Sequence, residues 1–142
     1  MSVRILIADD HARVRSEVRQ LIQDSGYDWQ VCCEAADGQD AIEQAAQFKP
    51  DLLVLDLIMP RCNGISAGRE IREFLPNSPM ILFTLLESEY LEREAKKAGF
   101  FAMVHKANSS LVLISAIRDA LAARISPLTN PPPEEPCGPS RL

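Results

Sequence analysis

Five side chains suited to metal or phosphate chemistry stand at the ends of four short apolar runs in this chain. They are Asp9, Asp10, Asp56, Thr84 and Lys106. Near-continuous apolar runs are typical of parallel strands buried on both faces, and open α/β sheets bind ligands beyond the carboxyl ends of such strands. We therefore expect these side chains, which are distant in sequence, to meet at one edge of a sheet.

Three of the five are the carboxylates Asp9, Asp10 and Asp56. Carboxylates that crowd into a partly dehydrated cleft repel one another, and a divalent cation among them removes that repulsion. Hard oxygen ligands without a thiolate favour Mg²⁺ or Mn²⁺. The acidic residues therefore predict a site for one of these ions.

The other two side chains suit a phosphoryl group, because Lys106 supplies a compact positive charge and Thr84 supplies a hydroxyl donor. Neither is needed to bind a metal, so the whole set predicts phosphoryl transfer onto an aspartate. Each residue taken alone is better explained as a loop cap or a solvated side chain. The functional interpretation depends on finding all five at strand ends.

The segments between these residues alternate between strand-length and helix-length patterns. Apolar runs predict strands at residues 3–8, 31–33, 52–55, 80–83 and 102–104. Helical spacing of apolar residues predicts helices at about 12–24, from Gly38 or Asp40 to before Pro50, at 66–74, at 88–98 and after Asn108. Five such alternations with right-handed crossovers imply an α/β fold, a doubly wound five-stranded parallel sheet with helices on both faces.

The fifth predicted helix is apolar on more than one side. Its core stripe is predicted to consist of Leu111, Ile114, Ile117 and Leu121. Other apolar residues, Val112, Leu113 and Ala116, add surface beyond what one contact with the sheet requires.

Composition divides the chain into one domain, residues 1–125, and a tail, residues 126–142. The tail holds Pro127, Pro131, Pro132, Pro133, Pro136 and Pro139, which predict a flexible segment that is not helical. No recognition helix or second core follows, so we expect no attached output domain in this chain.

Charge and hydropathy exclude other classes of function. The chain has 142 residues, 46% of them hydrophobic, and a net charge of -5 without a basic stripe, so nucleic acid is not an expected direct partner. Its apolar runs are too short to cross a bilayer, and residues 1–6 lack the layout of a signal peptide. We expect a soluble, cytoplasmic protein that does not bind membranes.

The cysteines and histidines are predicted to have no role in the site. Cys32, Cys33, Cys62 and Cys137 lack the spacing of a zinc site and are expected to be reduced thiols, with the adjacent pair on opposite faces of a strand. The two histidines, His11 and His105, are expected to be structural, because Mg²⁺ rarely binds imidazole.

Four motifs carry a resemblance to a known family. They are Ile7-Ala8-Asp9-Asp10-His11, Asp56-Leu57-Ile58-Met59-Pro60 followed by Asn63-Gly64, Phe83-Thr84, and Ala98-Gly99 leading to Lys106. With these motifs, the chain resembles the receiver domain of two-component response regulators over about residues 3–122. The resemblance implies a flavodoxin-like fold with strand order 2-1-3-4-5.

The resemblance also implies a role for each residue of the site. Asp56 would accept the phosphoryl group from the phosphohistidine of a histidine kinase or a histidine phosphotransfer protein. The metal ligands would be Asp10 directly, Asp9 directly or through water, Asp56 and the backbone carbonyl of Ile58. The phosphoryl oxygens would be held by Thr84 and Lys106, and the protein would catalyse only its own phosphorylation and dephosphorylation.

Phosphorylation is expected to switch the surface formed by the fourth helix, fifth strand and fifth helix, which would then bind a downstream protein or a second copy of the chain. In the loop beneath the acceptor, Pro60 fixes φ and Gly64 is expected to supply a positive φ.

Several positions depart from the family pattern. Met103 replaces the usual aromatic residue, and Ala107 follows Lys106 in place of proline, which predicts a trans peptide. Apolar residues at Ile58, Leu85 and Leu86 would border the acceptor and exclude water, which predicts a long-lived phosphoaspartate.

Two alternatives remain open. A Mg²⁺-dependent phosphohydrolase of the haloacid dehalogenase type also uses an aspartate, a threonine and a lysine, but it needs a general acid where Ile58 stands. A receiver that serves only as a scaffold would not need the complete set of site residues.

Overall fold

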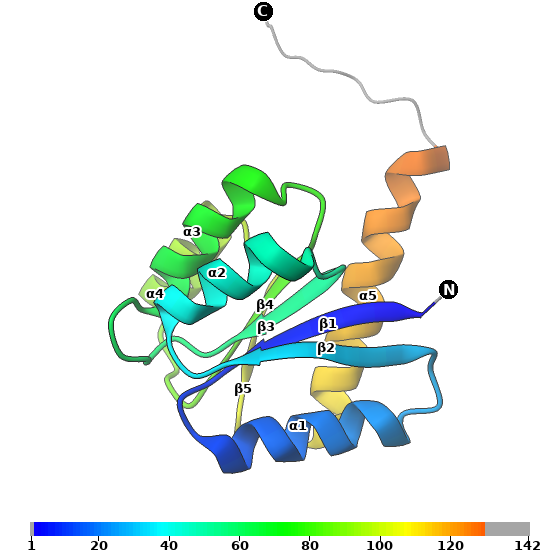
Figure 1. Cartoon of the computed structure of the whole chain (residues 1–142), viewed down its shortest axis with the longest axis horizontal. Helices are drawn as coiled ribbons and strands as arrows, with labels where there is room; N and C mark the ends of the chain where they lie inside the picture. Colours follow the sequence, from blue (N-terminus) through cyan, green and yellow to red (C-terminus); the bar gives the residue numbers. More distant parts are fainter. Residues whose placement is uncertain (1, 130–142) are drawn as a thin grey trace, which may run out of the picture.

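The computed structural model describes residues 2–129, with side chains up to Arg124. In this part of the chain, one sheet contains five parallel strands in the order β2-β1-β3-β4-β5 (Figure 1). The strands are β1 (Val3–Ala8), β2 (Trp29–Ala35), β3 (Leu52–Leu55), β4 (Met80–Thr84) and β5 (Ala102–His105). The predicted doubly wound sheet is confirmed. β1 has β2 on one side and β3 on the other, so the strand order reverses beside β1.

Helices cover both faces of the sheet (Figure 1). They are α1 (Ala12–Asp24), α2 (Gly38–Phe48), α3 (Gly64–Phe74), α4 (Glu89–Ala98) and α5 (Ser110–Thr129). Buried residues of α2, α3 and α4 form one apolar cluster with side chains such as Leu6, Leu53 and Leu82. A second cluster on the opposite face joins α1 and α5 to Ile5, Val54 and Ile81. Alternate residues of each central strand therefore belong to different clusters, as expected for strands buried on both faces.

Side-chain caps set the starts of three helices. Asp37, Asn63 and Ser88 each accept a hydrogen bond from a backbone N–H in the first turn of α2, α3 and α4. Such caps satisfy donors that have no partner inside the helix. The cap at Asn63 explains why α3 begins at Gly64, two residues before its predicted start. Gly99, with φ of 103°, ends α4 as the sequence predicts.

The predicted core stripe of α5 is wrong in part. Leu113 is buried together with Ile117, Ala120 and Leu121, whereas Leu111 is 74% exposed. Both sets of residues have helical spacing, and a helix that is apolar on several sides does not reveal which set faces the sheet. Leu113 belongs to the second apolar cluster, so the side of α5 that carries Leu113 faces the sheet.

The predicted end of α5 is also wrong. The helix continues to Thr129, through four residues that were expected to begin the tail at Ser126. One proline, Pro127, removes a single backbone donor, while the run of prolines at residues 131–133 comes after the last helical residue. The rest of the predicted tail, residues 130–142, lies outside the described residues.

The two adjacent cysteines of β2 do not point to opposite faces as expected. The pairing with β1 changes register, from Ile5 opposite Val31 to Leu6 opposite Cys33, so Cys32 is an extra residue in β2. Such a bulge interrupts the alternation of side chains. The sulfur atoms of Cys32 and Cys33 consequently lie 3.4 Å apart.

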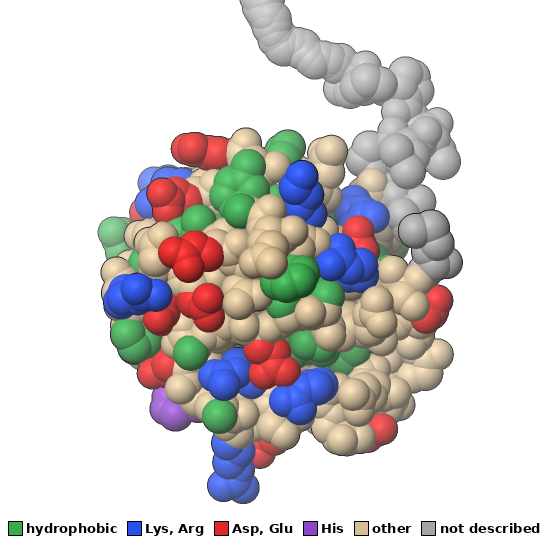
Figure 2. Space-filling model, viewed as in Figure 1, with side chains coloured by type: hydrophobic (Ala, Val, Ile, Leu, Met, Phe, Trp, Pro, Cys, Tyr) green, Lys and Arg blue, Asp and Glu red, His purple; other side chains and the backbone are tan. Residues whose placement is uncertain are grey.

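Acidic and basic side chains are interspersed over the face shown in Figure 2. Arg15 and Arg19 of α1, for example, both bind Glu34 of β2. None of the helices in the described residues is long and apolar enough to span a membrane.

Candidate functional site

The carboxyl ends of β1, β3, β4 and β5 bring four of the predicted residues together. Backbone hydrogen bonds continue past the strands at Asp9, Asp56 and Lys106, so each of these residues is held by the neighbouring strand. The side-chain Nζ of Lys106 donates to Asp9 Oδ2 at 2.6 Å and to Asp56 Oδ2 at 3.2 Å. Thr84 is the last residue of β4, and β4 lies between β3 and β5 in the sheet. The predicted cluster therefore exists.

Three polar residues of the cluster are largely removed from water. Asp9 is 2% exposed, Asp56 5% and Thr84 1%. Burial raises the pKa of Asp56; the charge of Lys106 opposes that shift and the charge of Asp9 adds to it, so the pKa stays above the ordinary value. Burial alone would lower the pKa of Lys106, but its hydrogen bond to Asp9 and the charge of Asp56 raise it. Lys106 is therefore a fixed cation between two carboxylates.

A cleft of about 560 Å³ opens directly onto these groups. Its polar lining comes from Asp10, His11, Asp56, Thr84 and Lys106, and its apolar lining from Val14, Ile58, Leu85 and Leu86. The three apolar residues predicted to border the acceptor thus lie on its walls. They are partly open to solvent, since Ile58 is 60% exposed. The cleft combines the buried carboxylate of Asp56 with an accessible mouth.

Asp9, Asp10 and His11 form a group of potential metal ligands whose donor atoms all lie within 4.8 Å of one another. His11 Nδ1 is 3.3 Å from Asp9 Oδ1 and 3.1 Å from Asp10 Oδ1. The backbone N–H of His11 also donates to Asp9 Oδ1. Sequence reasoning treated His11 as structural, and the structure places it at the rim of the acidic cluster. The sequence signal for this location is that His11 directly follows Asp9 and Asp10.

The loop from Asp56 to α3 does not use glycine in the expected way. Among the described residues, positive φ occurs in this loop at Arg61 (69°) and not at Gly64. Gly64 is instead constrained by space, because a Cβ there would collide with the backbone carbonyl oxygen of Asp56. Its N–H donates to the carbonyl of Leu57 at 2.8 Å. The expectation of positive φ at Gly64 is thus wrong, and close backbone approach is the reason for glycine.

The segment after β5 follows the prediction. The Lys106–Ala107 peptide is trans, as are the other peptide bonds of the described residues. His105 Nε2 lies 2.6 Å from the carbonyl oxygen of Leu85, and His105 Nδ1 accepts from the N–H of Ala107. His105 therefore joins the loops after β4 and β5, which supports the structural role expected for it.

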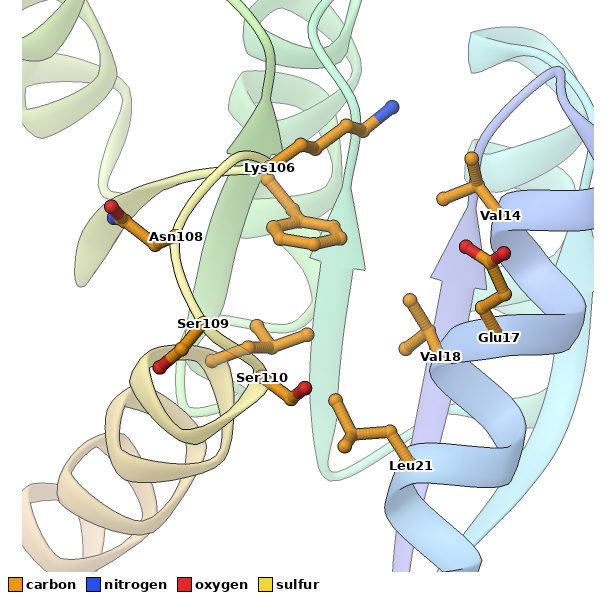
Figure 3. A pocket seen from close by; sticks show the side chains of 10 residues that line it. Val14, Glu17, Val18, Leu21, Lys106, Asn108, Ser109 and Ser110 are labelled. Carbon is orange, nitrogen blue, oxygen red and sulfur yellow. The ribbon is translucent and has the colours of Figure 1, made fainter.

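A second, smaller cavity of about 320 Å³ adjoins the site between α1 and the start of α5 (Figure 3). Val14, Val18 and Leu21 line it from α1, and Ser109 and Ser110 line it from the start of α5 and the residue before it. Lys106 borders this cavity too, and its side chain points away from Ser110 and Leu21 (Figure 3). One lysine thus connects the acidic cleft with the α1–α5 side of the molecule.

Comparison with known families decides what this arrangement is. The profile described as "Response regulator receiver domain" matches residues 5–118, which is most of the chain. The chain belongs to this family. It is a receiver domain of two-component response regulators, a class of signalling switches that interact with histidine kinases and with downstream targets.

Two curated relatives show the extent of the similarity. The transcriptional regulatory protein PdtaR of Mycobacterium tuberculosis is 37% identical over 119 residues, which cover 84% of this chain and 57% of PdtaR. The chemotaxis protein CheY of Thermotoga maritima is 37% identical over 99 residues, which cover 70% of this chain and 81% of CheY. This receiver spans about half the length of PdtaR.

Solved structures agree with the fold. A two-component response regulator of the LuxR family from Aurantimonas sp. SI85-9A1 superposes with a TM-score of 0.82 at 33% identity, covering 87% of this receiver and 88% of that chain. The flavodoxin-like fold and the strand order 2-1-3-4-5 are therefore confirmed. The comparisons support the receiver interpretation and not the phosphohydrolase alternative, for which Ile58 also offers no acidic group.

Proposed function

We propose that Asp56 is the phosphoacceptor of this receiver. The observation that carries the proposal is the position of Lys106, whose Nζ lies 3.2 Å from the Asp56 carboxylate in a cleft that also contains Thr84. A buried carboxylate beside a fixed cation and a hydroxyl matches the needs of phosphoryl transfer, in which charge develops on the phosphoryl oxygens.

In the proposed reaction, an Asp56 oxygen attacks the phosphorus of a phosphohistidine presented by a histidine kinase or a histidine phosphotransfer protein. The N–P bond breaks as the O–P bond forms, and the imidazole leaves with the electron pair. Lys106 and Thr84 hold the phosphoryl oxygens. The receiver catalyses its own modification in this scheme, and later hydrolysis of the aspartyl phosphate returns it to the starting state.

The residues present fit a Mg²⁺ ion, with Mn²⁺ as a substitute. The ligands would be the carboxylates of Asp9, Asp10 and Asp56 and the carbonyl of Ile58. The raised pKa of Asp56 has burial as its main cause and the charge of Asp9 as a contributor, which is the imbalance that a cation in the cluster corrects. When bound, Mg²⁺ supplies positive charge beside the transferred phosphoryl group.

We further propose that phosphorylation changes the surface formed by α4, β5 and α5, called the output face below. Thr84 is followed by the exposed Leu85, and the exposed side chains of Tyr90, Leu111 and Val112 lie on α4 and α5. A shift of Thr84 toward a phosphoryl group would move this loop. The output face would then bind a downstream protein or a second copy of the chain.

One experiment tests the acceptor and the switch together. The full chain is incubated with Mg²⁺ and acetyl phosphate, and intact mass and oligomeric state are measured for the wild type and for Asp56→Asn. We expect one phosphoryl adduct on the wild type, none on the variant, and a change in oligomeric state only where the adduct forms. An adduct on Asp56→Asn would overturn the assignment of Asp56.

The same experiment separates the remaining alternatives. An unmodified wild type would indicate a scaffold that does not switch. Steady release of phosphate from a monoester substrate, without a stable adduct, would indicate the phosphohydrolase.

A further inference from the structure

Cys32 and Cys33 are placed for joint chemistry by the bulge in β2. In a regular strand, neighbouring side chains point to opposite faces, and two adjacent thiols do not meet. Here Cys32 is the extra residue opposite the Ile5-to-Leu6 step of β1, and its sulfur lies 3.4 Å from that of Cys33. The two thiols are therefore within contact distance although they are adjacent in sequence.

The pair is also accessible. β2 is an edge strand of the sheet, with β1 as its neighbour (Figure 1). Both cysteines are half-buried, and Cys33 packs against the apolar cluster beneath α2. Because both residues are partly exposed at the edge of the sheet, a small reagent does not need the core to unfold before it meets them.

The two thiols differ in acidity. The side-chain hydrogen bond with Cys33 lowers the pKa of Cys32 to about 7; burial opposes this shift and Arg4 assists it. The same hydrogen bond and burial raise the pKa of Cys33. Cys32 is thus the more acidic thiol of the pair, and its thiolate is available at neutral pH. A thiol whose pKa lies near the ambient pH is the most effective attacking group in thiol–disulfide exchange.

We propose that Cys32 and Cys33 form a modification site for small-molecule disulfides of the glutathione class, with Cys32 as the attacking thiol and Cys33 as the resolving thiol. The thiolate of Cys32 attacks one sulfur of the small disulfide, whose S–S bond breaks and releases one thiolate. The Cys33 thiol then loses its proton and attacks the sulfur of Cys32, releasing the second small thiolate. Two protein thiols are oxidised by two electrons, and one small disulfide is reduced to two thiols.

The product is expected to be easily reversed. Neighbouring Cα atoms are about 3.8 Å apart across a trans peptide, whereas unstrained disulfides prefer a Cα separation of roughly 4.4–6.8 Å. A disulfide between adjacent residues is therefore strained and is readily reduced by excess thiol. The bulge lowers the obstacle to closing the ring, because its extra residue is not fixed by the regular ladder.

The test uses the full chain with Cys62→Ser and Cys137→Ser, which leaves only the adjacent pair. After treatment with glutathione disulfide at neutral pH and quenching in acid, intact mass should show the loss of two hydrogens with little retained glutathione. Adding Cys33→Ser should trap one glutathione per chain. Two retained adducts on the parent, or a stable single adduct on the parent with no loss of two hydrogens, would overturn the proposal.

A second measurement does not depend on how well the single variants fold. Phenylarsine oxide bridges two neighbouring thiols, so it should bind once per chain to the parent and protect both cysteines from alkylation. The matched control is Cys32→Ser with Cys33→Ser, which keeps Cys62 and Cys137 and should show no such protection. Failure of the parent to bind the arsenical would contradict the proposed site. None of these outcomes depends on Asp56, so failure here leaves the proposed phosphoacceptor untouched.

Discussion

Lys106 binds the nearly inaccessible carboxylate of Asp9 at 2.6 Å, across 97 residues of sequence. The same ammonium reaches Asp56 at the longer distance of 3.2 Å. The lysine is shared between two carboxylates and is held closer to the one that is not the proposed acceptor. Lys106 thus has a structural function in addition to the one proposed for it in phosphoryl transfer.

This sharing predicts opposite effects on stability for two substitutions. Lys106→Met leaves two buried carboxylates without their cation and should lower the free energy of unfolding by about 3–5 kcal/mol, as for other buried pairs that lose one partner. Asp56→Asn should raise it. A carboxyl group whose pKa is higher in the folded state penalises folding once it ionises, and asparagine removes that penalty.

Urea unfolding at neutral pH in buffer with a metal chelator measures both effects. Lys97→Met, which removes a lysine paired at the surface with Glu94, is the matched control and should change stability little. A Lys106→Met protein as stable as the wild type would contradict the structural role of the lysine.

The sequence predicted the architecture and the site to different depths. Strand ends could be located because apolar runs stop at Asp9, Asp56 and Thr84, and alternating elements imply a parallel sheet that gathers those ends. The core stripe of α5 could not be predicted, because Leu111 and Leu113 both fit helical spacing. The choice between them depends on tertiary contacts with the sheet, which a local pattern does not contain.

Local backbone irregularities were a second limit. The β2 bulge depends on how two strands pair, so the approach of Cys32 to Cys33 is invisible in the sequence of either strand. The sequence indicated that position 64 needs glycine. The physical reason is the nearby carbonyl of Asp56, which leaves no room for a Cβ, and not a positive φ. In both cases the deciding contact joins residues whose spatial relation appears only after folding.

The proposed metal site predicts that Mg²⁺ stabilises the receiver through Asp10. At a free ion concentration one hundred times its dissociation constant, a single site should add about 2.7 kcal/mol to the free energy of unfolding. Asp10→Asn should lose most of this increment, because a neutral amide replaces an anionic ligand in the cleft. Thermal unfolding with and without Mg²⁺ measures it for each protein.

Two controls sharpen the metal prediction. Asp24→Asn removes an exposed carboxylate at the other end of α1 and should keep the full response to Mg²⁺. His11→Ala tests whether the imidazole beside Asp10 acts as a ligand; hard cations prefer oxygen, so this variant should also respond. An undiminished response in Asp10→Asn would remove that residue from the ligand set.

Gly64→Ala should disturb the acceptor loop directly. The added Cβ would meet the carbonyl oxygen of Asp56, and relief of that clash must displace the acceptor or the start of α3. We expect a loss of about 1–3 kcal/mol in stability, as for other overpacked sites, and slower phosphorylation by acetyl phosphate. Gly26→Ala is the control: its φ of 86° strains alanine, but no atom lies within 4 Å of the added Cβ, so only stability should fall.

The apolar walls of the cleft predict a long-lived phosphoaspartate. Ile58→Asn and Leu86→Glu place polar groups beside Asp56 and should let water reach the aspartyl phosphate, which shortens its half-life several-fold. Leu111→Asn changes an exposed apolar residue outside the cleft lining and should leave the half-life unchanged. The measurement follows loss of the phosphoryl adduct by intact mass after the donor is removed. Unchanged or slower hydrolysis in both cleft variants would refute the shielding role.

The acidity of Cys32 predicts a distinct pH dependence of alkylation. In the chain that carries Cys62→Ser and Cys137→Ser, the rate of reaction with iodoacetamide should be half-maximal at a pH of about 7, since only the thiolate reacts and the hydrogen bond with Cys33 lowers the pKa of Cys32. A lowered pKa means that the reactive form is already present at neutral pH and is lost below it.

The groups that act on this pair determine how the variants should behave. Cys33→Ala removes this hydrogen bond and should move the midpoint up toward the ordinary cysteine value of 9.0. Arg4→Gln removes a nearby positive charge and should move it up by less, whereas Asp51→Asn removes a negative charge and should move it down. Asp40, which acts on Cys33, should have little effect on Cys32. A midpoint that stays the same in the parent and in Cys33→Ala would show that the contact across the bulge does not control the reactivity of Cys32.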